Sequence, residues 1–147
     1  RRLRVLIAED NVDAADSLQM LLQAAGYEVA VTHSGSAALE LARRTKPDAV
    51  LCDIGLPGIN GYEVARALRA DPVHRRARLI AITGYGSAED RRMALAAGFD
   101  SHHPKPVAAA DLLAELRAGT PHDQDGLPSR PGGSGTAGFR RNALSRA

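Results

Sequence analysis

Short apolar runs alternate with segments of helical periodicity along most of the chain. The apolar runs are typical of buried or half-buried strands, and they cover residues 3–8, 27–32, 48–52, 78–83 and, more briefly, 100–103. The segments with apolar residues at helical spacing are 12–26, 34–44, 61–70, 87–98 and 108–119. Five strands alternating with five helices predict an α/β domain whose parallel sheet is covered by helices on both faces.

Polar residues stand where the predicted strands end. In a parallel sheet all carboxyl ends meet at one edge, and functional groups of α/β proteins gather there. The residues at these ends are Glu9 and Asp10 after the first strand, Asp53 after the third, Thr83 at the end of the fourth and Lys105 after the fifth. We therefore expect these five side chains to form one site.

This set of side chains has a coherent chemistry. Three converging carboxylates repel one another and need a cation, and hard oxygen ligands with open positions for water suit Mg²⁺. Lys105 supplies a positive charge for an anionic ligand, and Thr83 supplies a hydroxyl donor. The run Gly-Leu-Pro-Gly at 55–58 lets the backbone turn sharply after Asp53 and direct a carbonyl at the metal. An aspartate in this position can attack phosphorus and form an acyl phosphate.

Composition narrows the class of protein. Residues 1–118 hold 15 basic and 15 acidic side chains, so the net charge of +2 arises in the last 29 residues and favours no nucleic-acid partner. The single cysteine, Cys52, excludes an internal disulfide, fits a reducing compartment and is interpreted as a buried apolar residue. No apolar run approaches the roughly 18–20 residues of a membrane span, and no signal peptide opens the chain. We expect a cytoplasmic domain that makes no membrane contact.

The last segment, residues 119–147, has a different composition. It holds nine of the 22 glycines and prolines of the chain and few core-forming side chains, which predicts a disordered tail or linker. Its Arg140-Arg141 pair suggests nucleic-acid binding, but no helix-turn-helix pattern or aromatic-basic interleaving accompanies it. We favour a solvated tail.

The motifs, in the order in which they occur along the chain, resemble those of the response-regulator receiver domain of two-component signalling, over roughly residues 3–118. The resemblance rests on Glu9-Asp10, on DIGLPGINGYE at 53–63, on AITG ending with Thr83 and Gly84, and on Lys105-Pro106. The stretches GLPGINGYEVARALR and GFDSHHPKPV look especially like receivers of hybrid sensor histidine kinases or chemotaxis-type multidomain proteins. The resemblance implies a bacterial phosphoprotein with a flavodoxin-like (βα)5 fold, a doubly wound five-stranded sheet of order 2-1-3-4-5, and a receiver domain at 1–118.

The resemblance also implies a role for each acidic residue. Asp53 is expected to accept the phosphoryl group and to ligate Mg²⁺. Asp10 is expected to bind the ion directly, Glu9 to act through coordinated water, and Gly55 to supply its backbone carbonyl. The phosphoryl donor would be a phosphohistidine on a histidine kinase or a histidine phosphotransfer protein. The domain would not be a kinase itself, and it would lose the phosphoryl group slowly.

The resemblance implies that the remaining motif residues take part in the response to phosphorylation. Thr83 is expected to hydrogen-bond the phosphoryl group, and Lys105 to pair with one of its oxygens. Pro106 is expected to follow a cis peptide bond that orients the lysine. His102 occupies the position of the ring that turns on phosphorylation in this family, where tyrosine or phenylalanine is common. Movement of Thr83 and this ring would change the surface of the fourth helix, fifth strand and fifth helix, to which a downstream protein would bind.

The fifth strand departs from the usual pattern. His103-Pro104 stands where two apolar residues are usual, and a proline cannot donate to a strand ladder. We therefore expect this strand to be short and to lie at the sheet edge. A metal site at the adjacent pair His102-His103 is disfavoured, because neighbouring strand residues point to opposite faces.

Two alternative functions remain open. A haloacid-dehalogenase-type phosphatase also uses an aspartyl phosphate, Mg²⁺, threonine and lysine, but its nucleophile belongs to a D-x-D pattern after the first strand, where this chain has Glu9-Asp10-Asn11. A pseudo-receiver would share the receiver fold, bind a protein partner and never accept a phosphoryl group.

Overall fold

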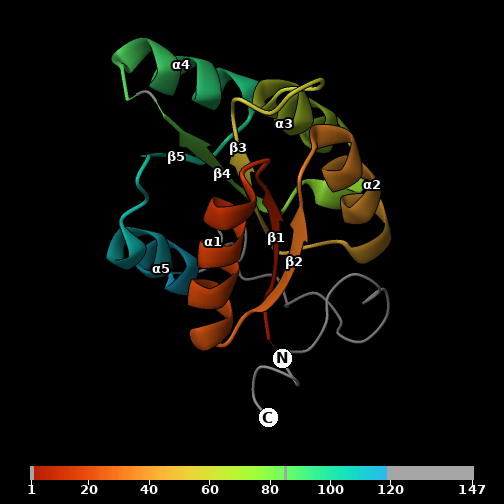
Figure 1. Cartoon of the computed structure of the whole chain (residues 1–147). Helices are drawn as coiled ribbons and strands as arrows, with labels where there is room; N and C mark the ends of the chain where they lie inside the picture. The colour runs from red at the N-terminus through yellow and green to blue at the C-terminus, as the bar shows by residue number, and fades with distance from the viewer. Residues whose placement is uncertain (1, 85, 119–147) are drawn as a thin grey trace.

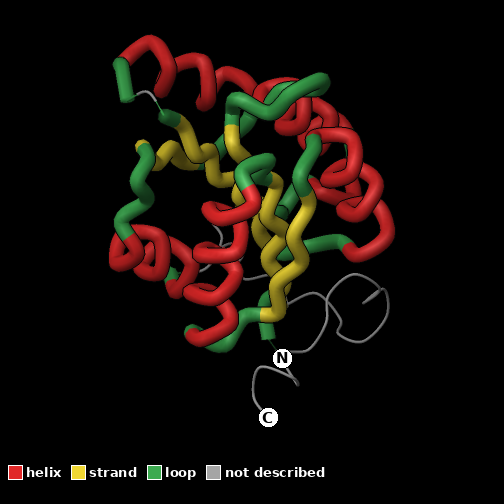
Figure 2. The backbone as a smooth tube through the Cα atoms, in the orientation of Figure 1, coloured by secondary structure: helices red, strands yellow, loops and turns green. Residues whose placement is uncertain are grey.

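The computed structural model of the chain describes residues 2–84 and 86–118, and it shows a five-stranded sheet between helices (Figure 1, Figure 2). The strands are β1 Arg4–Ala8, β2 Glu28–Thr32, β3 Ala49–Asp53, β4 Arg78–Thr83 and β5 Ser101–Pro104. The helices are α1 Val12–Ala24, α2 Gly35–Thr45, α3 Gly61–Ala70, α4 Ala88–Ala97 and α5 Ala109–Arg117. The predicted tail, residues 119–147, lies outside the described residues.

The sheet topology confirms the predicted fold. The strand order is β2-β1-β3-β4-β5, and every neighbouring pair is parallel. The order reverses between β1 and β3, which places the ends of these two central strands beside each other. None of the helices in the described residues has the length and apolar character that a membrane span requires.

Successive side chains of the central strands enter two separate cores, because strand residues alternate between the faces of a sheet. Val5 and Ile7 of β1 pack with α1 and α5 on one face, whereas Leu6 and Ala8 pack with α2, α3 and α4 on the other. All five residues of β1 and of β3 are buried. A fully buried leucine or isoleucine contributes about 1.5–3 kcal/mol, so the strand that carries Asp53 is held firmly in the core.

Capping residues explain where several helices begin. Asn60 accepts a hydrogen bond from the Glu63 backbone while the Glu63 side chain accepts one from the Asn60 backbone, so α3 starts with a complete capping box. Ser34 caps α2 and Ser87 caps α4, each through a hydroxyl oxygen that accepts the backbone N–H of the residue three positions on. The short 3-10 helix at Pro72–His74, which the sequence pattern did not predict, is capped by Asp71.

The fifth strand is short and lies at the sheet edge, as the proline at its end predicts. β5 has four residues and pairs with β4 alone. His103 points toward α5, where its Nε2 donates to Glu115 Oε1 over 2.7 Å. His102 therefore points toward the opposite face of the sheet.

Glu115 fastens α5 to the sheet near the amino ends of the strands. Its Oε2 accepts hydrogen bonds from Arg78 Nε and from Ser101 Oγ, each over 2.6 Å. Burial alone would raise the pKa of Glu115, but the hydrogen bonds from His103, Ser101 and Arg78 outweigh it and lower the pKa to about 2. We call these four residues the Glu115 cluster.

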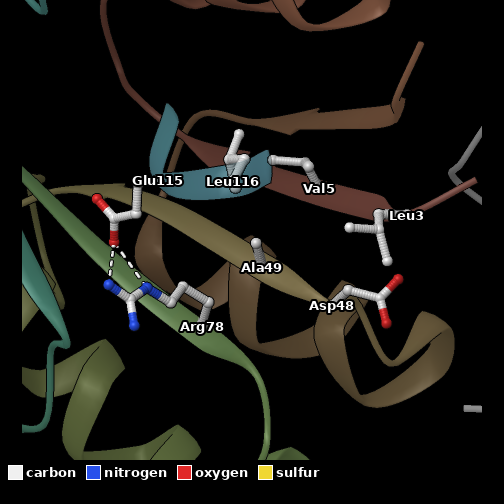
Figure 3. A pocket seen from close by; sticks show the side chains of 7 residues that line it. All are labelled: Leu3, Val5, Asp48, Ala49, Arg78, Glu115 and Leu116. Carbon is white, nitrogen blue, oxygen red and sulfur yellow. Dashed lines mark hydrogen bonds and ion pairs between the residues drawn. The ribbon is translucent and has the colours of Figure 1, made fainter. Parts of the chain in front are cut away.

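The Glu115 cluster borders a small hollow, shown in Figure 3. Its lining is mainly apolar, with Arg78 and Glu115 paired on one side, and it comprises Leu3, Val5, Asp48, Ala49, Arg78, Glu115 and Leu116. Leu3 and Asp48 each precede a strand and Arg78 begins one, so the hollow lies at the amino edge of the sheet. The predicted site is at the opposite edge.

Gly61 allows the loop after β3 to fold back onto the strand end. The Gly61 N–H donates to the Ile54 carbonyl oxygen over 2.9 Å. A Cβ atom at Gly61 would lie 2.7 Å from the Asp53 carbonyl oxygen and 2.7 Å from Ile54 Cα. Both are backbone atoms, so a side chain here would force the end of β3 to move.

We predict that Gly61→Ala lowers the free energy of unfolding by about 1–3 kcal/mol, the usual cost of overpacking. Urea denaturation of the variant and the wild type measures this difference. Gly84→Ala is the matched control, because a Cβ at exposed Gly84 meets no atom within 4 Å. The control should change stability by less than about 0.5 kcal/mol. Equal stabilities of the two variants would contradict the proposed clash.

A second prediction concerns acid stability. The folded-state pKa of Glu115 lies below its ordinary value of 4.5, so its contribution is present above pH 4.5 and is lost as the pH falls toward about 2. The wild type should exceed Glu115→Gln in unfolding free energy at pH 6, and this difference should shrink by about 2 kcal/mol at pH 3. Denaturation of both proteins at the two pH values tests this.

The control for this experiment is Glu40→Gln, which changes an exposed glutamate of α2. The described part of the chain offers Glu40 no hydrogen-bond or ion-pair partner. The difference between this variant and the wild type should be the same at both pH values. A pH-independent difference for Glu115→Gln would show that its carboxylate is not the titrating group.

Candidate functional site

Three carboxylates meet at the carboxyl ends of β1 and β3. Asp53 is the last residue of β3, Glu9 and Asp10 directly follow β1, and Ala8 stands in register with Cys52 on the neighbouring strand. One oxygen from each carboxylate lies within 4.8 Å of the others. We call Glu9, Asp10 and Asp53 the acid cluster. Parallel pairing of β1 and β3 thus brings together residues that are more than 40 positions apart.

The two neighbouring acids have opposite environments. Glu9 is 1% exposed, and its Oε2 accepts a hydrogen bond from the Asn11 N–H over 3.0 Å. Burial raises the pKa of Glu9 above its ordinary value, although Asn11 and Lys105 act in the opposite direction. Asp10 is exposed to solvent. Glu9 therefore belongs to the floor of the cluster, and Asp10 to its open side.

Lys105 places its ammonium group between two members of the acid cluster. Its Nζ lies 3.0 Å from Glu9 Oε1 and 3.2 Å from Asp53 Oδ2. Burial lowers the pKa of Lys105, but Glu9 and Asp53 outweigh this effect and raise it above the ordinary value. Lys105 is therefore charged and pairs with two carboxylates in this structure.

The backbone around Lys105 is attached to the end of β4. The Lys105 N–H donates to the Thr83 carbonyl oxygen over 2.7 Å, and the peptide bond to Pro106 is cis, the isomer that the resemblance implies. Thr83 itself is buried at 4% exposure. Since Asp53 is in register with Ile82, Thr83 extends one residue beyond Asp53 on the adjacent strand. Both predicted partners of a phosphoryl group thus stand at the same edge as Asp53.

Asp53 is oriented from two sides. Its Oδ1 accepts a hydrogen bond from the Gly55 N–H over 3.0 Å, while its Oδ2 contacts Lys105. The residue is 7% exposed, so only a small part of its surface is open to solvent. Cys52, on the preceding position, is fully buried, and burial raises the pKa of its thiol to about 12, with a further contribution from Asp53. Cys52 is thus an inert core residue, as interpreted from the sequence.

His102 lies away from the acid cluster. It is in register with Ala81, two positions before Thr83, in the middle of β5. Both of its ring nitrogens are buried, and they have no hydrogen-bond partner among the described residues. The imidazole nitrogens therefore occupy buried positions that are costly for a polar ring.

Two residues that contact the acid cluster were not predicted from the sequence. Asn11 caps α1 through its side chain and donates its backbone N–H to Glu9. The Nδ1 atom of His33 lies 2.9 Å from the Glu9 carbonyl oxygen. His33 directly follows the end of β2, so the same rule that selected the other strand-end residues applied to it.

The acid cluster fits a small divalent cation. Its donors are all carboxylate oxygens, which are hard ligands, and the exposed position of Asp10 leaves room for water on an ion. One ammonium group stands against three carboxylates, so the cluster retains negative charge. These properties suit Mg²⁺ better than a soft metal.

Comparisons with known proteins give a consistent result. The model of the response regulator receiver domain family matches residues 5–117. The DNA-binding response regulator MtrA of Mycolicibacterium smegmatis is 35% identical over 124 residues, which cover 84% of this chain and 53% of MtrA. The chain thus spans about half the length of the curated relatives that it matches.

Solved structures of receiver domains share the fold. A CheY-like receiver domain protein of Methanospirillum hungatei has a TM-score of 0.74 and 30% identity, covering 80% of this chain and 93% of that one. The receiver domain of a sensor histidine kinase of Pseudomonas aeruginosa, which has a magnesium ion in its active-site cleft, has a TM-score of 0.74 and 32% identity, covering 80% and 97%. With its matching family model, strand order and acid cluster, the chain belongs to the response regulator receiver domain family.

Proposed function

We propose that Asp53 accepts a phosphoryl group from a phosphohistidine on a histidine kinase or histidine phosphotransfer protein, with Mg²⁺ as cofactor. The observation that carries this proposal is the position of the Asp53 carboxylate, which lies within the acid cluster and 3.2 Å from Lys105 Nζ. A partly accessible carboxylate between a cation site and an ammonium group has the surroundings that phosphoryl transfer requires.

The residues proposed to hold Mg²⁺ are Asp10, Asp53 and the Gly55 backbone carbonyl, with Glu9 acting through coordinated water. Support comes from the all-oxygen donor set and from the magnesium ion in the cleft of the Pseudomonas receiver. When bound, the ion would neutralise charge on the phosphoryl oxygens. Buried Glu9, paired with Lys105, would contribute negative charge from below without competing for a direct bond.

The transfer step exchanges one bond to phosphorus for another. An Asp53 carboxylate oxygen bonds to phosphorus while the phosphorus–nitrogen bond of the phosphohistidine breaks, and its electron pair stays on the imidazole nitrogen. Lys105 contacts Asp53 Oδ2 before transfer, so the ammonium group needs only a small movement to reach an equatorial phosphoryl oxygen. The product is an aspartyl phosphate.

The response is proposed to pass from Thr83 to the surface of α4, β5 and α5. Thr83 would hydrogen-bond the phosphoryl group, and His102 would move in response. The unpartnered ring nitrogens of His102 in this structure support a second position in which they gain a partner. A downstream protein would bind the changed surface.

The match to the receiver family bears on only one of the two alternative functions. The match to the receiver family does not favour a haloacid-dehalogenase-type phosphatase. A pseudo-receiver would have the same fold without accepting phosphate, so only chemistry separates it from the proposal. The relative MtrA is named a DNA-binding response regulator, and the absence of nucleic-acid contact in this segment stays a prediction.

We predict that the protein gains the mass of one phosphoryl group on incubation with acetyl phosphate and Mg²⁺. The gain should be absent in Asp53→Ala and in the presence of a chelator, because the nucleophile or the cation is then missing. Asp16→Ala, at an exposed aspartate of α1, is the control and should be modified like the wild type. An unmodified wild type would favour a pseudo-receiver, and continuous turnover of many phosphate esters would favour a phosphatase.

A further prediction separates phosphorylation from the response. Thr83→Val keeps the shape of the side chain but removes its hydroxyl group, so the variant should still gain the phosphoryl mass. Beryllofluoride, which mimics the aspartyl phosphate, should shift backbone amide resonances of α4, β5 and α5 in the wild type and shift them much less in the variant. Full shifts in Thr83→Val would remove this threonine from the proposed pathway.

A further inference from the structure

The end of β2 restrains Glu9 through two consecutive residues. The Glu9 N–H donates to the Thr32 carbonyl oxygen over 3.0 Å, which continues the β1–β2 ladder by one residue. The Thr32 hydroxyl donates to the Ile7 carbonyl oxygen over 2.9 Å. The His33 ring then lies 2.9 Å from the Glu9 carbonyl oxygen. The backbone that enters the acid cluster is thus fixed from the side of β2.

The direction of the His33 hydrogen bond follows from its partner. A carbonyl oxygen can only accept, so His33 Nδ1 carries the hydrogen and donates it. The accepting oxygen belongs to the peptide unit that joins Glu9 to Asp10, and a planar peptide transmits its orientation directly to the next Cα. The bond therefore restricts where the Asp10 side chain begins.

Asp10 depends on its neighbours for its position. It is exposed, and the described residues provide no hydrogen-bond partner for its carboxylate. On one side Glu9 is fixed by Thr32, His33 and Lys105, and on the other Asn11 is fixed as the N-cap of α1. Of these contacts, the His33 bond acts on the Glu9–Asp10 peptide itself.

We propose that His33 is a positioning residue for the Glu9–Asp10 pair: its Nδ1–H bond orients the peptide so that Glu9 points down to Lys105 while Asp10 points toward the cation. This inference rests on the proposed function, in which Asp10 and Glu9 act on Mg²⁺. In this proposal His33 contacts neither the ion nor the phosphoryl group, and its effect passes through the backbone.

The test compares Mg²⁺ affinity in three proteins. His33→Phe keeps a ring but removes the donor, whereas His33→Asn places an amide N–H close to the position of Nδ1. Titration followed by backbone amide resonances should give three- to ten-fold weaker Mg²⁺ binding for His33→Phe and binding within two-fold of the wild type for His33→Asn. In the metal-free proteins, the Asp10 and Asn11 amide resonances should be shifted from their wild-type positions in His33→Phe and should have wild-type positions in His33→Asn.

Ser36→Ala serves as the matched control. Ser36 is an exposed residue three positions away, and its hydroxyl contacts only that of Ser34 in the described residues. The Ser36→Ala variant should bind Mg²⁺ with the affinity of the wild type. Wild-type affinity in His33→Phe, or equal weakening in His33→Phe and His33→Asn, would overturn the inference while leaving the proposed function in place. A wild type that bound no Mg²⁺ would overturn both.

Discussion

Repulsion among three carboxylates at one end of a parallel sheet is the constraint on which the candidate site depends. Oxygens of Glu9, Asp10 and Asp53 lie within 4.8 Å of one another, and each charged pair at this distance costs on the order of 3 kcal/mol at a typical effective dielectric. The Lys105 ammonium contacts two of the three, at 3.0 and 3.2 Å. The remaining negative charge makes the site receptive to a divalent cation.

Each edge of the sheet holds one glutamate that is shielded from solvent, and the pKa values of the two shift in opposite directions. At the amino edge Glu115 accepts hydrogen bonds from Arg78, Ser101 and His103, and these lower its pKa to about 2. At the carboxyl edge burial raises the pKa of Glu9, because Asn11 and Lys105 compensate it only in part. The satisfied glutamate stabilises the packing of α5, whereas the incompletely compensated one stands beside the proposed reacting group. Stability and the proposed function therefore depend on opposite edges of the same sheet.

Most of the fold and the membership of the site could be predicted from the sequence. The strands were visible as apolar runs, and the rule that strand ends share one edge was sufficient to group Asp53 with Lys105, which is 52 residues away. The interactions within the site could not be predicted. The Glu9–Lys105 ion pair and the His33 bond depend on side-chain directions, and His33 was passed over because an isolated histidine carries no motif.

By itself, the sequence determined the alternation of elements, the two-sided burial of the central strands and the identity of the strand-end residues, since periodicity and turn chemistry are local properties of a chain. Only the tertiary structure decided that Glu9 is buried while Asp10 is exposed, and that Lys105 lies between Glu9 and Asp53. These properties depend on which strands become neighbours and on how a few backbone groups, such as the Glu9 carbonyl, find partners. The burial and the side-chain contacts of these residues are set by packing across the sheet, and no local sequence pattern encodes them.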